Sequence, residues 1–519
     1  MLAAILASTL IHPVPLAGQC TWSAVAGDPN GLVRDLVVHD DGSGPMLFAA
    51  GTFTAVGSTV GVPHVAKWDG LIWQPVGSVS FQGGHVNALA VFDYGTGPKL
   101  YAGGDFWQIG GVAANHIACW DGNTWAPLTG GGIGTGPFDG WVQSLLVFDD
   151  GTGPALYVGG SFSVAGGVPA QNIARWDGIS WSSLGSGIGP VSLSAVECMA
   201  GFDEGGWPPK LYVGGTFQSA GGVTANGIAR WDGLGWTDVG GGVSRLGAPP
   251  RVSALAVFDG GSGERIYAGG QFDQAGTVAS ANLASWNGSS WSSTGSGLTG
   301  NLPASVKALT VFDAGNGPRL VVGGGFTLAG GLPANSLAAW DGSSWSDFSW
   351  GTTSSPSQGL VLSLASFDDG FGARLHAGGS IFLAGSGPLT TERLIVLSCP
   401  RPLAVSALQP LGPGMPVHIR AAGLVAGNEY FILYSSSPCP GPPGSGPLLG
   451  LCAATPQDLQ FLLLQLMNPL GSPASHFIAT GTDMSWGPLM LPPLTVDALC
   501  IDVTNVPVSF SSVARMIIQ

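Results

Sequence analysis

Short apolar runs alternate with turn-forming residues along most of this chain. The runs are rich in Val, Ile, Leu, Phe, Tyr and Trp, and they are bounded by Gly, Pro, Asp and Ser. This pattern is typical of short antiparallel strands joined by tight turns. The same four phrases recur in the same order: Val-x-Ala-Leu-x-Val-Phe-Asp, then Gly-x-Gly-Pro-x-Leu-Tyr-x-Gly-Gly-x-Phe, then Ile-Ala-x-Trp-Asp-Gly, then x-x-Trp-x-x-Leu-Gly. The pattern therefore predicts a repeat of four antiparallel strands.

Two markers count the repeats. The motif Trp-Asp-Gly-x-x-Trp, once with Asn for Asp, recurs at spacings of 52, 56, 55, 55 and 54 residues and begins at Trp68, Trp120, Trp176, Trp231, Trp286 and Trp340. An Asp before a Gly-rich turn occurs seven times, at Asp40, Asp93, Asp149, Asp203, Asp259, Asp313 and Asp368. A four-stranded unit cannot bury both faces alone, whereas radial stacking buries them and protects the strand edges. We therefore predict an all-β fold with a seven-bladed β-propeller.

The two ends of the repeat region complement each other. The first copy has only the fourth phrase, at 21–27, and the seventh copy stops after its third phrase, at 393–398. We expect the N-terminal strand to complete the last blade. Cys20 and Cys399 flank these two strands where the Trp-Asp-Gly turn is missing. We predict a disulfide between them.

The predicted domains are a propeller over 20–399 and a small β-sandwich over 400–519, preceded by a predicted signal segment over 1–19. That segment is an apolar run followed by Pro and small residues, and it is atypical because it has no positively charged start. In the sandwich we expect strands over 417–421, 429–435, 476–480, 495–503 and 509–519, and either a buried strand or a short helix over 458–467.

The remaining cysteines divide into two groups. Cys439 and Cys452 flank a Gly/Pro loop, and an exported context favours a disulfide between them. Three others stand inside strand phrases, and we expect them to be buried small hydrophobic side chains: Cys119, Cys198 and Cys500.

The longer repeat phrase resembles known families. Leu-Tyr-x-Gly-Gly followed by a Trp strand resembles the kelch repeat, and Gly-Gly-x-Phe-x-x-Ala-Gly-Gly-x-x-Ala-x-x-Ile-Ala-x-Trp-Asp-Gly-x-x-Trp is similar to repeats of bacterial surface proteins and of Rax2-type cortical cell-polarity markers. The resemblance covers residues 21–399 and implies a propeller that serves as a binding scaffold.

Composition and charge narrow the range of functions that the chain can have. The formal net charge is -15, with only 16 Lys and Arg, so the chain lacks the basic surface that nucleic acid binding requires. At least twelve of the 31 acidic residues fall at the two repeated turn positions, which makes the acidity a matter of turn chemistry. No apolar run after the start approaches the ~20 residues that span a bilayer. We expect a secreted, cell-surface or periplasmic protein with no membrane span.

Motifs for catalysis are missing. The sequence has no Gly-x-Ser-x-Gly, Gly-Lys, His-Glu-x-x-His or Cys-x-x-Cys, so we expect no enzyme activity, cofactor or metal centre. The repeated turn Asp residues have two interpretations, Ca²⁺ ligands or Asx-type turns, and the turn is favoured because Asp-x-Asp-x-Asp is absent. The Asp of Trp-Asp-Gly is also interpreted as a turn residue, since Asn287 replaces it at the same spacing.

The binding face is predicted from the loops. The tryptophans of the repeated motif are expected in the core, which leaves five that are free for another role: Trp107, Trp141, Trp207, Trp350 and Trp486. The links between blades run 11, 13, 17, 15, 16, 15 and 16 residues, whereas the turns at the other rim are nearly constant. Variable loops on a rigid scaffold often carry recognition. The candidate binding residues on these links are Phe81, Phe138, Trp141, Arg245, Arg251 and Trp350.

The sequence thus indicates a non-enzymatic binding protein that holds a protein or a glycan. The alternative is a carbohydrate-active hydrolase or lyase on the same scaffold. Such an enzyme would need paired carboxylates outside the repeated turns. Asp139 and Glu197 are the candidates, but they are far apart in sequence.

Overall fold

The structure, a computed structural model, describes the repeat region and the strands of the C-terminal part. The described residues are 21–62, 64–77, 81–134, 140–189, 194–300, 303–314, 317–347, 359–368, 373–383 and 390–398, followed by 404–408, 417–422, 429–435, 476–478, 483–489, 494–502, 509–510 and 514–518. They contain strands and turns and no helix, so none of them forms a helix that could cross a membrane.

Two compact units make up the chain. One comprises Thr21–Phe367 and Arg374–Leu397, and the other comprises Met1–Cys20, Asp368–Ala373 and Ser398–Gln519.

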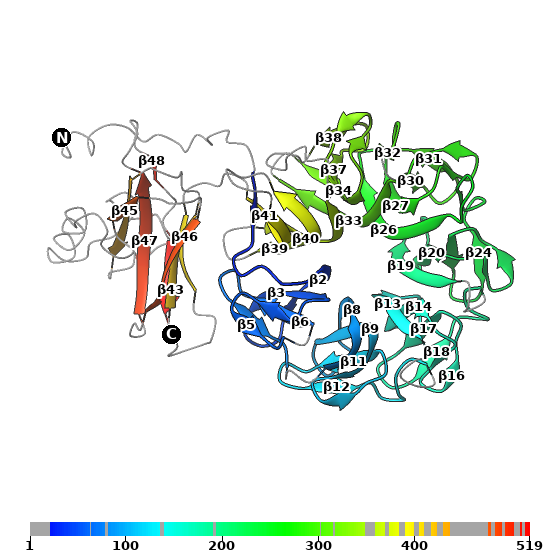
Figure 1. Cartoon of the computed structure of the whole chain (residues 1–519), viewed down its shortest axis with the longest axis horizontal. Helices are drawn as coiled ribbons and strands as arrows, with labels where there is room; N and C mark the ends of the chain where they lie inside the picture. Colours follow the sequence, from blue (N-terminus) through cyan, green and yellow to red (C-terminus); the bar gives the residue numbers. More distant parts are fainter. Residues whose placement is uncertain are drawn as a thin grey trace. The chain divides into compact units, whose positions relative to one another are not determined.

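Seven antiparallel sheets of at least four strands form the described part of the large unit and stand around a common axis (Figure 1). The inner strands nearest the axis are β2 (Val33–Asp40), β8 (Phe81–Phe92), β13 (Trp141–Asp149), β19 (Ala195–Phe202), β26 (Arg251–Asp259), β33 (Ser305–Asp313) and β39 (Leu360–Asp368). The second strands are β3 (Pro45–Gly51), β9 (Lys99–Ile109), β14 (Pro154–Ser161), β20 (Lys210–Thr216), β27 (Glu264–Gln271), β34 (Pro318–Gly325) and β40 (Ala373–Leu383).

The third and fourth strands complete each sheet toward the periphery. The third strands are β6 (Val65–Trp68), β11 (Ile117–Trp120), β17 (Ile173–Trp176), β23 (Ile228–Trp231), β30 (Leu283–Trp286), β37 (Leu337–Trp340) and β41 (Thr390–Ser398). The fourth strands are β7 (Trp73–Pro75), β12 (Trp125–Pro127), β18 (Trp181–Ser183), β24 (Trp236–Asp238), β31 (Trp291–Ser293), β38 (Trp345–Asp347) and β1 (Thr21–Ala24). The four phrases of the repeat therefore form four strands in chain order.

Successive sheets pack through the paired glycines of the second strand. A Cβ on Gly159 would lie 2.4 Å from Val196 of the next inner strand, and one on Gly160 would lie 2.1 Å from the carbonyl oxygen of Trp141 in its own sheet. The first glycine thus lets the next sheet approach, and the second accommodates a β-bulge in the inner strand. This explains why Gly-Gly recurs where an alternating strand would carry side chains.

The repeated tryptophans connect neighbouring sheets. The two rings of each Trp-Asp-Gly-x-x-Trp motif lie 5.2 to 6.4 Å apart. The second ring also reaches the preceding sheet. For example, Trp236 Nε1 donates to the carbonyl of Leu184 at 2.9 Å, and Trp291 Nε1 donates to Val239 at 2.9 Å. The prediction that these side chains belong to the core is confirmed.

The repeated carboxylates close their own turns. Asp40 Oδ1 accepts the backbone N–H groups of Gly42 at 2.9 Å and Gly44 at 3.0 Å, and the equivalent residues of four further sheets make similar bonds. In the Trp-Asp-Gly turns, Asn287 Oδ1 accepts from Ser289 and Ser290 just as the Asp residues do elsewhere. These contacts are those of the Asx-type turn.

The ends of the repeat region meet in one sheet. Its strand order is β1-β41-β40-β39, so the N-terminal strand completes the last sheet, as the sequence predicts. A Cβ on Gly378 of β40 would lie 2.6 Å from Val33 of β2. The last and first sheets therefore meet through the same glycine–valine contact that joins the other neighbouring sheets. The large unit is a β-propeller.

The two rims of the ring carry different parts of the repeat. We call the end that carries the Asp-Gly and Trp-Asp-Gly turns the turn rim, and the opposite end, where the links enter the inner strands, the link rim. The links are anchored there: β25 (Val243–Ser244) pairs with the small hairpin β28 (Gln274–Ala275) and β29 (Val278–Ala279) of the next sheet. Bridges between Ile133 and Ala165 and between Ile188 and Ala220 repeat this contact. Part of these three links therefore packs as a constant junction.

The C-terminal unit contains two antiparallel sheets. One has the order β42 (Ala404–Leu408), β43 (Val417–Ala422), β46 (Asp483–Leu489). The other contains β45 (His476–Ile478), β44 (Glu429–Ser435), β47 (Leu494–Asp502) and β48 (Ser509–Phe510), with β49 (Ala514–Ile518) also paired to β47. β42 lies against β47 and β49, as expected for two stacked sheets. The sequence did not predict β42 or β46, and the ambiguous segment 458–467 lies outside the described residues.

Candidate functional site

The structure describes only some of the predicted binding residues. Phe138 and Trp350 lie outside the described residues, and of Phe81 only the backbone is described, where it begins β8 opposite Ile109. Arg245 is half-buried on the link between β25 and β26. Trp141 and Arg251 are well placed, each as the first residue of an inner strand on the link rim.

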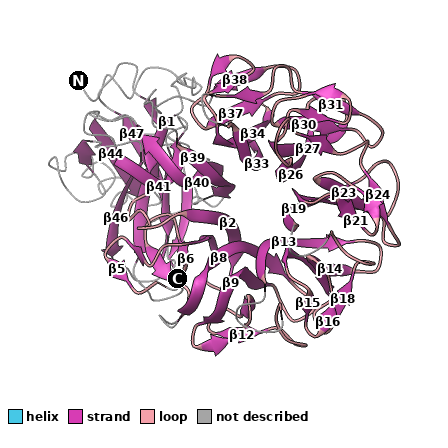
Figure 2. Cartoon of the chain, turned by 45° about the vertical axis from the view of Figure 1, so that its right-hand side comes forward, coloured by secondary structure: helices cyan, strands magenta, loops and turns pink. Residues whose placement is uncertain are grey.

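Trp141 and Arg251 occupy the same position in two different sheets. Each stands immediately before the repeated Val, and each pairs with the residue that follows Gly-Gly, Ser161 for Trp141 and Gln271 for Arg251. The Trp141 residue is 43% exposed, and so is the Arg251 side chain. Figure 2 shows β13 and β26 among the strands whose ends border the centre of the ring. The link rim therefore presents an exposed aromatic ring and an exposed guanidinium around the axis.

A ring of polar residues stands just behind these positions. The bulge places one extra residue into the inner strand, between the repeated Val and the small residue that follows. Six of these bulge residues are polar: Arg34, Asn87, Gln143, Glu197, Ser253 and Lys307. These residues were not predicted as a group, although each stands at the variable second position of the repeated Val-x-Ala-Leu phrase.

Hydrogen bonds join several members of the ring to the neighbouring inner strand. Asn87 Nδ2 donates to the carbonyl of Val142 at 2.8 Å. Ser253 Oγ donates to Glu197 Oε2 at 3.0 Å, and Lys307 Nζ donates to Ser253 Oγ at 3.4 Å. Since each bond crosses from one inner strand to the next, the ring also holds sheets together.

Glu197 is the centre of this network. Its carboxylate accepts from Arg251 Nε at 2.6 Å and from Thr216 Oγ1 at 2.9 Å, in addition to Ser253. Burial lowers the pKa of Lys307, the charge of Arg251 lowers it further, and Glu197 opposes both. Arg251 thus bonds directly to the carboxylate, whereas Lys307 is connected to it through Ser253. Asp139, its suggested partner in an enzyme, lies outside the described residues.

A second cluster of titratable side chains lies on the link rim of the first two sheets. His85 Nδ1 is 3.5 Å from Asp105 Oδ1, and the backbone N–H of His85 also donates to this carboxylate. Burial lowers the pKa of both His64 and His85, which favours neutral imidazoles. Among the described residues, no three His, Cys, Asp or Glu side chains are arranged to hold a metal ion.

The other predicted positions are less informative. Trp207 is 78% exposed, but it belongs to the turn rim between β19 and β20. Cys119 and Cys198 are free thiols, and burial raises the pKa of both; only Cys198 is fully buried, so the expectation for Cys119 is only partly met. Cys20, Cys399, Cys439 and Cys452 lie outside the described residues, so both disulfides stay predictions.

Comparison with known proteins agrees with the fold. A family described as "Domain of unknown function (DUF5122) beta-propeller" matches residues 210–231, which correspond to β20 and β23 and the segment between them. The matched family is described as a β-propeller, in agreement with the fold. The resemblance to kelch and Rax2-type repeats stays a prediction. No curated protein matches the sequence.

The solved structures that match this chain are remote in sequence. Two are extracellular domains of putative hybrid two-component systems of B. thetaiotaomicron, with 9% and 10% identity and TM-scores of 0.22 and 0.24, each covering 94% of this chain and 74% and 72% of their own. A third is an ancestral GH74 enzyme, with 12% identity, a TM-score of 0.19, and coverage of 78% of this chain and 75% of its own.

Proposed function

We propose that this protein is a non-enzymatic binding protein of the cell exterior, which holds a protein or a glycan on the link rim of its propeller. The observation that carries the proposal is the placement of Trp141 and Arg251 at equivalent, exposed positions beside the axis. Aromatic rings and guanidinium groups dominate binding hot spots, and aromatic faces also stack on sugars. The apolar N-terminal run of the sequence supports the exterior location.

The arrangement behind these residues favours recognition over catalysis. The carboxylate of Glu197 is engaged by Arg251, Thr216 and Ser253. A carboxylate engaged by a basic partner and hydroxyl donors can orient the guanidinium that bonds to it. Arg251 is thus held in one position while part of its side chain faces solvent, which reduces the entropy lost when a ligand binds.

The test uses paired variants on the two rims. Retention of the purified protein on immobilised polysaccharides and on cell-surface protein fractions is measured for the wild type and for the Trp141→Ala and Arg251→Gln variants. Trp207→Ala is the matched control, because it removes an even more exposed tryptophan from the opposite rim. We expect at least a tenfold loss with either link-rim variant, as for a hot-spot residue, and unchanged retention with the control.

Two results would contradict the proposal. Undiminished retention by folded Trp141→Ala and Arg251→Gln proteins would move the site away from the link rim. Release of new reducing ends from a retained polysaccharide, scored in the same assay, would instead establish the alternative of a carbohydrate-active hydrolase or lyase.

A further inference from the structure

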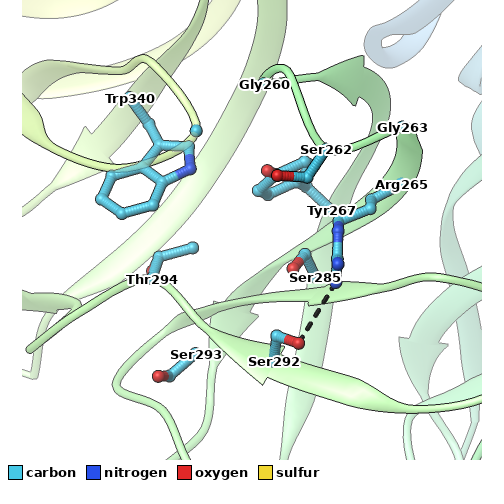
Figure 3. Close-up of a pocket in the computed structure, with 11 residues that line it drawn as sticks. Gly260, Ser262, Gly263, Arg265, Tyr267, Ser285, Ser292, Ser293, Thr294 and Trp340 are labelled. Atoms are coloured by element: carbon cyan, nitrogen blue, oxygen red, sulfur yellow. Dashed lines mark hydrogen bonds between the residues drawn. The ribbon is translucent and has the colours of Figure 1, made fainter.

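A cavity of about 180 Å³ opens on the turn rim between the sheets of β27 and β34. Its lining comes from two neighbouring sheets, and Figure 3 shows Trp340 on one side of the space with Tyr267 and Arg265 on the other. Ser285, Ser292 and Thr294 complete the wall. Tyr267 is 3% exposed and Trp340 is 6% exposed, so both rings are buried at this junction.

The other sheets show what normally occupies this junction. In the sheet of β20, Glu204 lies in the equivalent place and accepts from the hydroxyl of Tyr212 and from Arg230 Nη1 at 2.6 Å. Trp286 of the next sheet in turn donates to the Tyr212 hydroxyl at 3.1 Å. In the first sheet, Asp41 and Lys67 form the same acid–base pair at 2.6 Å. A carboxylate thus occupies the junction in both of these sheets.

The sheet of β27 keeps the donors and lacks the carboxylate. Tyr267 and Trp340 correspond to Tyr212 and Trp286, whereas Gly260 stands where Glu204 would be and Ser285 stands where Arg230 would be. Gly260 abuts Gly342, just as Glu204 abuts Gly288. The cavity therefore exists because two side chains that fill the sister junction are absent.

The chemistry of the lining is that of an anion site. It contains one cation, Arg265, and no Asp or Glu. The nearby carboxylates of Asp259 and Asp341 accept backbone N–H bonds within their own turns. Within the described structure, the buried indole N–H of Trp340 makes no hydrogen bond of normal geometry, and it lies toward the hydroxyl of Tyr267. Tyr267 and Arg265 thus line the cavity without a carboxylate of the kind that Glu204 supplies to Tyr212 and Arg230 in the sister sheet.

We propose that this cavity binds a small carboxylate, which takes the place of the missing acidic side chain. Tyr267 donates to the ligand as Tyr212 does to Glu204, and Arg265 supplies the positive charge. Arg265 already lies along the wall, where its Nη1 donates to Ser292 Oγ at 3.2 Å. The site is on the opposite rim from the proposed binding surface and is independent of it.

The experiment measures acetate binding to the full-length protein by ligand-observed NMR. A ligand of four heavy atoms is expected to bind with a dissociation constant on the order of 1 mM. Acetamide, a neutral molecule of the same shape, serves as the ligand control. Glucuronate is run in parallel to tell whether the site also takes a carboxylate carried on a sugar.

The protein variants are matched between sister junctions. Tyr267→Phe and Arg265→Gln are each expected to weaken acetate binding at least tenfold, whereas Tyr212→Phe, the same change in the occupied junction, leaves it unchanged. Thermal melting verifies folding, and either of the two test variants suffices if the other does not fold. The proposal is overturned if acetate gives no signal at about 100 mM, roughly a hundred times the expected constant. Equal binding of acetamide, or full binding by both folded test variants, also overturns it.

Discussion

The carboxylate of Asp28 accepts the backbone N–H of Leu394 at 2.8 Å, although the two residues are 366 positions apart in the chain. It also accepts the N–H of Arg393 at 3.0 Å, and Val25 N–H donates to the carbonyl of Leu394 at 3.1 Å. Asp28 therefore fixes the chain just after β1 to β41, where the first and last parts of the ring meet.

Removing this carboxylate is expected to weaken ring closure. Asp28→Ala leaves two backbone donors without their acceptor and should cost about 2 to 3 kcal/mol of unfolding free energy. Asp28→Asn keeps one acceptor oxygen and should lose about half as much. Chemical denaturation measures both. Equal stability of Asp28→Ala and wild type would show that the Asp28 contacts do not contribute to closure.

The same junction predicts a disulfide. β1 begins at Thr21, directly after Cys20 in the sequence, and β41, the strand with which it pairs, ends at Ser398, directly before Cys399. We therefore expect Cys20 and Cys399 to be linked in the protein folded under oxidising conditions. A non-reduced digest analysed by mass spectrometry should contain the linked peptides, and Cys20→Ser should lower stability by about 2 to 4 kcal/mol. Finding both cysteines as free thiols would refute the link.

The turn of the Trp-Asp-Gly motif should tolerate amide for carboxylate. Asp177 Oδ1 accepts from the backbone N–H groups of Ile179 at 2.9 Å and Ser180 at 2.8 Å, and Asn287 makes the equivalent bonds in another sheet. Asp177→Asn is therefore expected to change stability little, whereas Asp177→Ala should cost about 1 kcal/mol.

The backbone bonds to Ser180 and Ile179, against the opposing effect of slight burial, also lower the pKa of Asp177. Its share of stability is hence present above the pKa of the unfolded chain and is lost as pH falls through the folded value. Equal melting of the Ala and Asn variants from neutral pH to pH about 3, just below the usual Asp value, would contradict the turn role.

A part-buried carboxyl on the inner strand β2, that of Asp35, should make stability depend on pH in the opposite sense. Burial raises the pKa of Asp35 to about 6, although the N–H groups of Leu89 and Leu36 donate to it. The folded protein therefore holds this proton more tightly than the unfolded chain, and stability declines as pH rises from about 4 to about 6.

A shift of about 2 units corresponds to at most about 3 kcal/mol. We expect Asp35→Asn to flatten this part of the stability profile, measured by denaturation at several pH values. Exposed Asp177→Asn is the control, since it should leave this decline in place. An unchanged decline in Asp35→Asn would assign the effect to another group, such as Asp28, whose pKa burial also raises to about 6.

Much of the fold follows from short-range pattern. The Gly-Gly pair, the Asp-Gly turns and the two tryptophans predicted four strands per repeat, because turn geometry and the alternation of side chains along a strand are local properties. The fragmentary first and last copies predicted the pairing of β1 with β41 for the same reason. The C-terminal sheets were only partly predicted: β44 has the expected bounds, whereas β42 and β46 were missed in a segment without a repeat to guide the interpretation.

Only the tertiary structure decided the contacts between sheets. Glu197 and Arg251 stand 54 residues apart, and only the stacking of β19 against β26 brings the carboxylate to the guanidinium. The cavity beside Tyr267 likewise arises because Gly260 and Trp340, from different sheets, meet at one junction. Sequence phrases describe one sheet at a time, whereas each of these sites is formed by side chains that two sheets place across a shared interface.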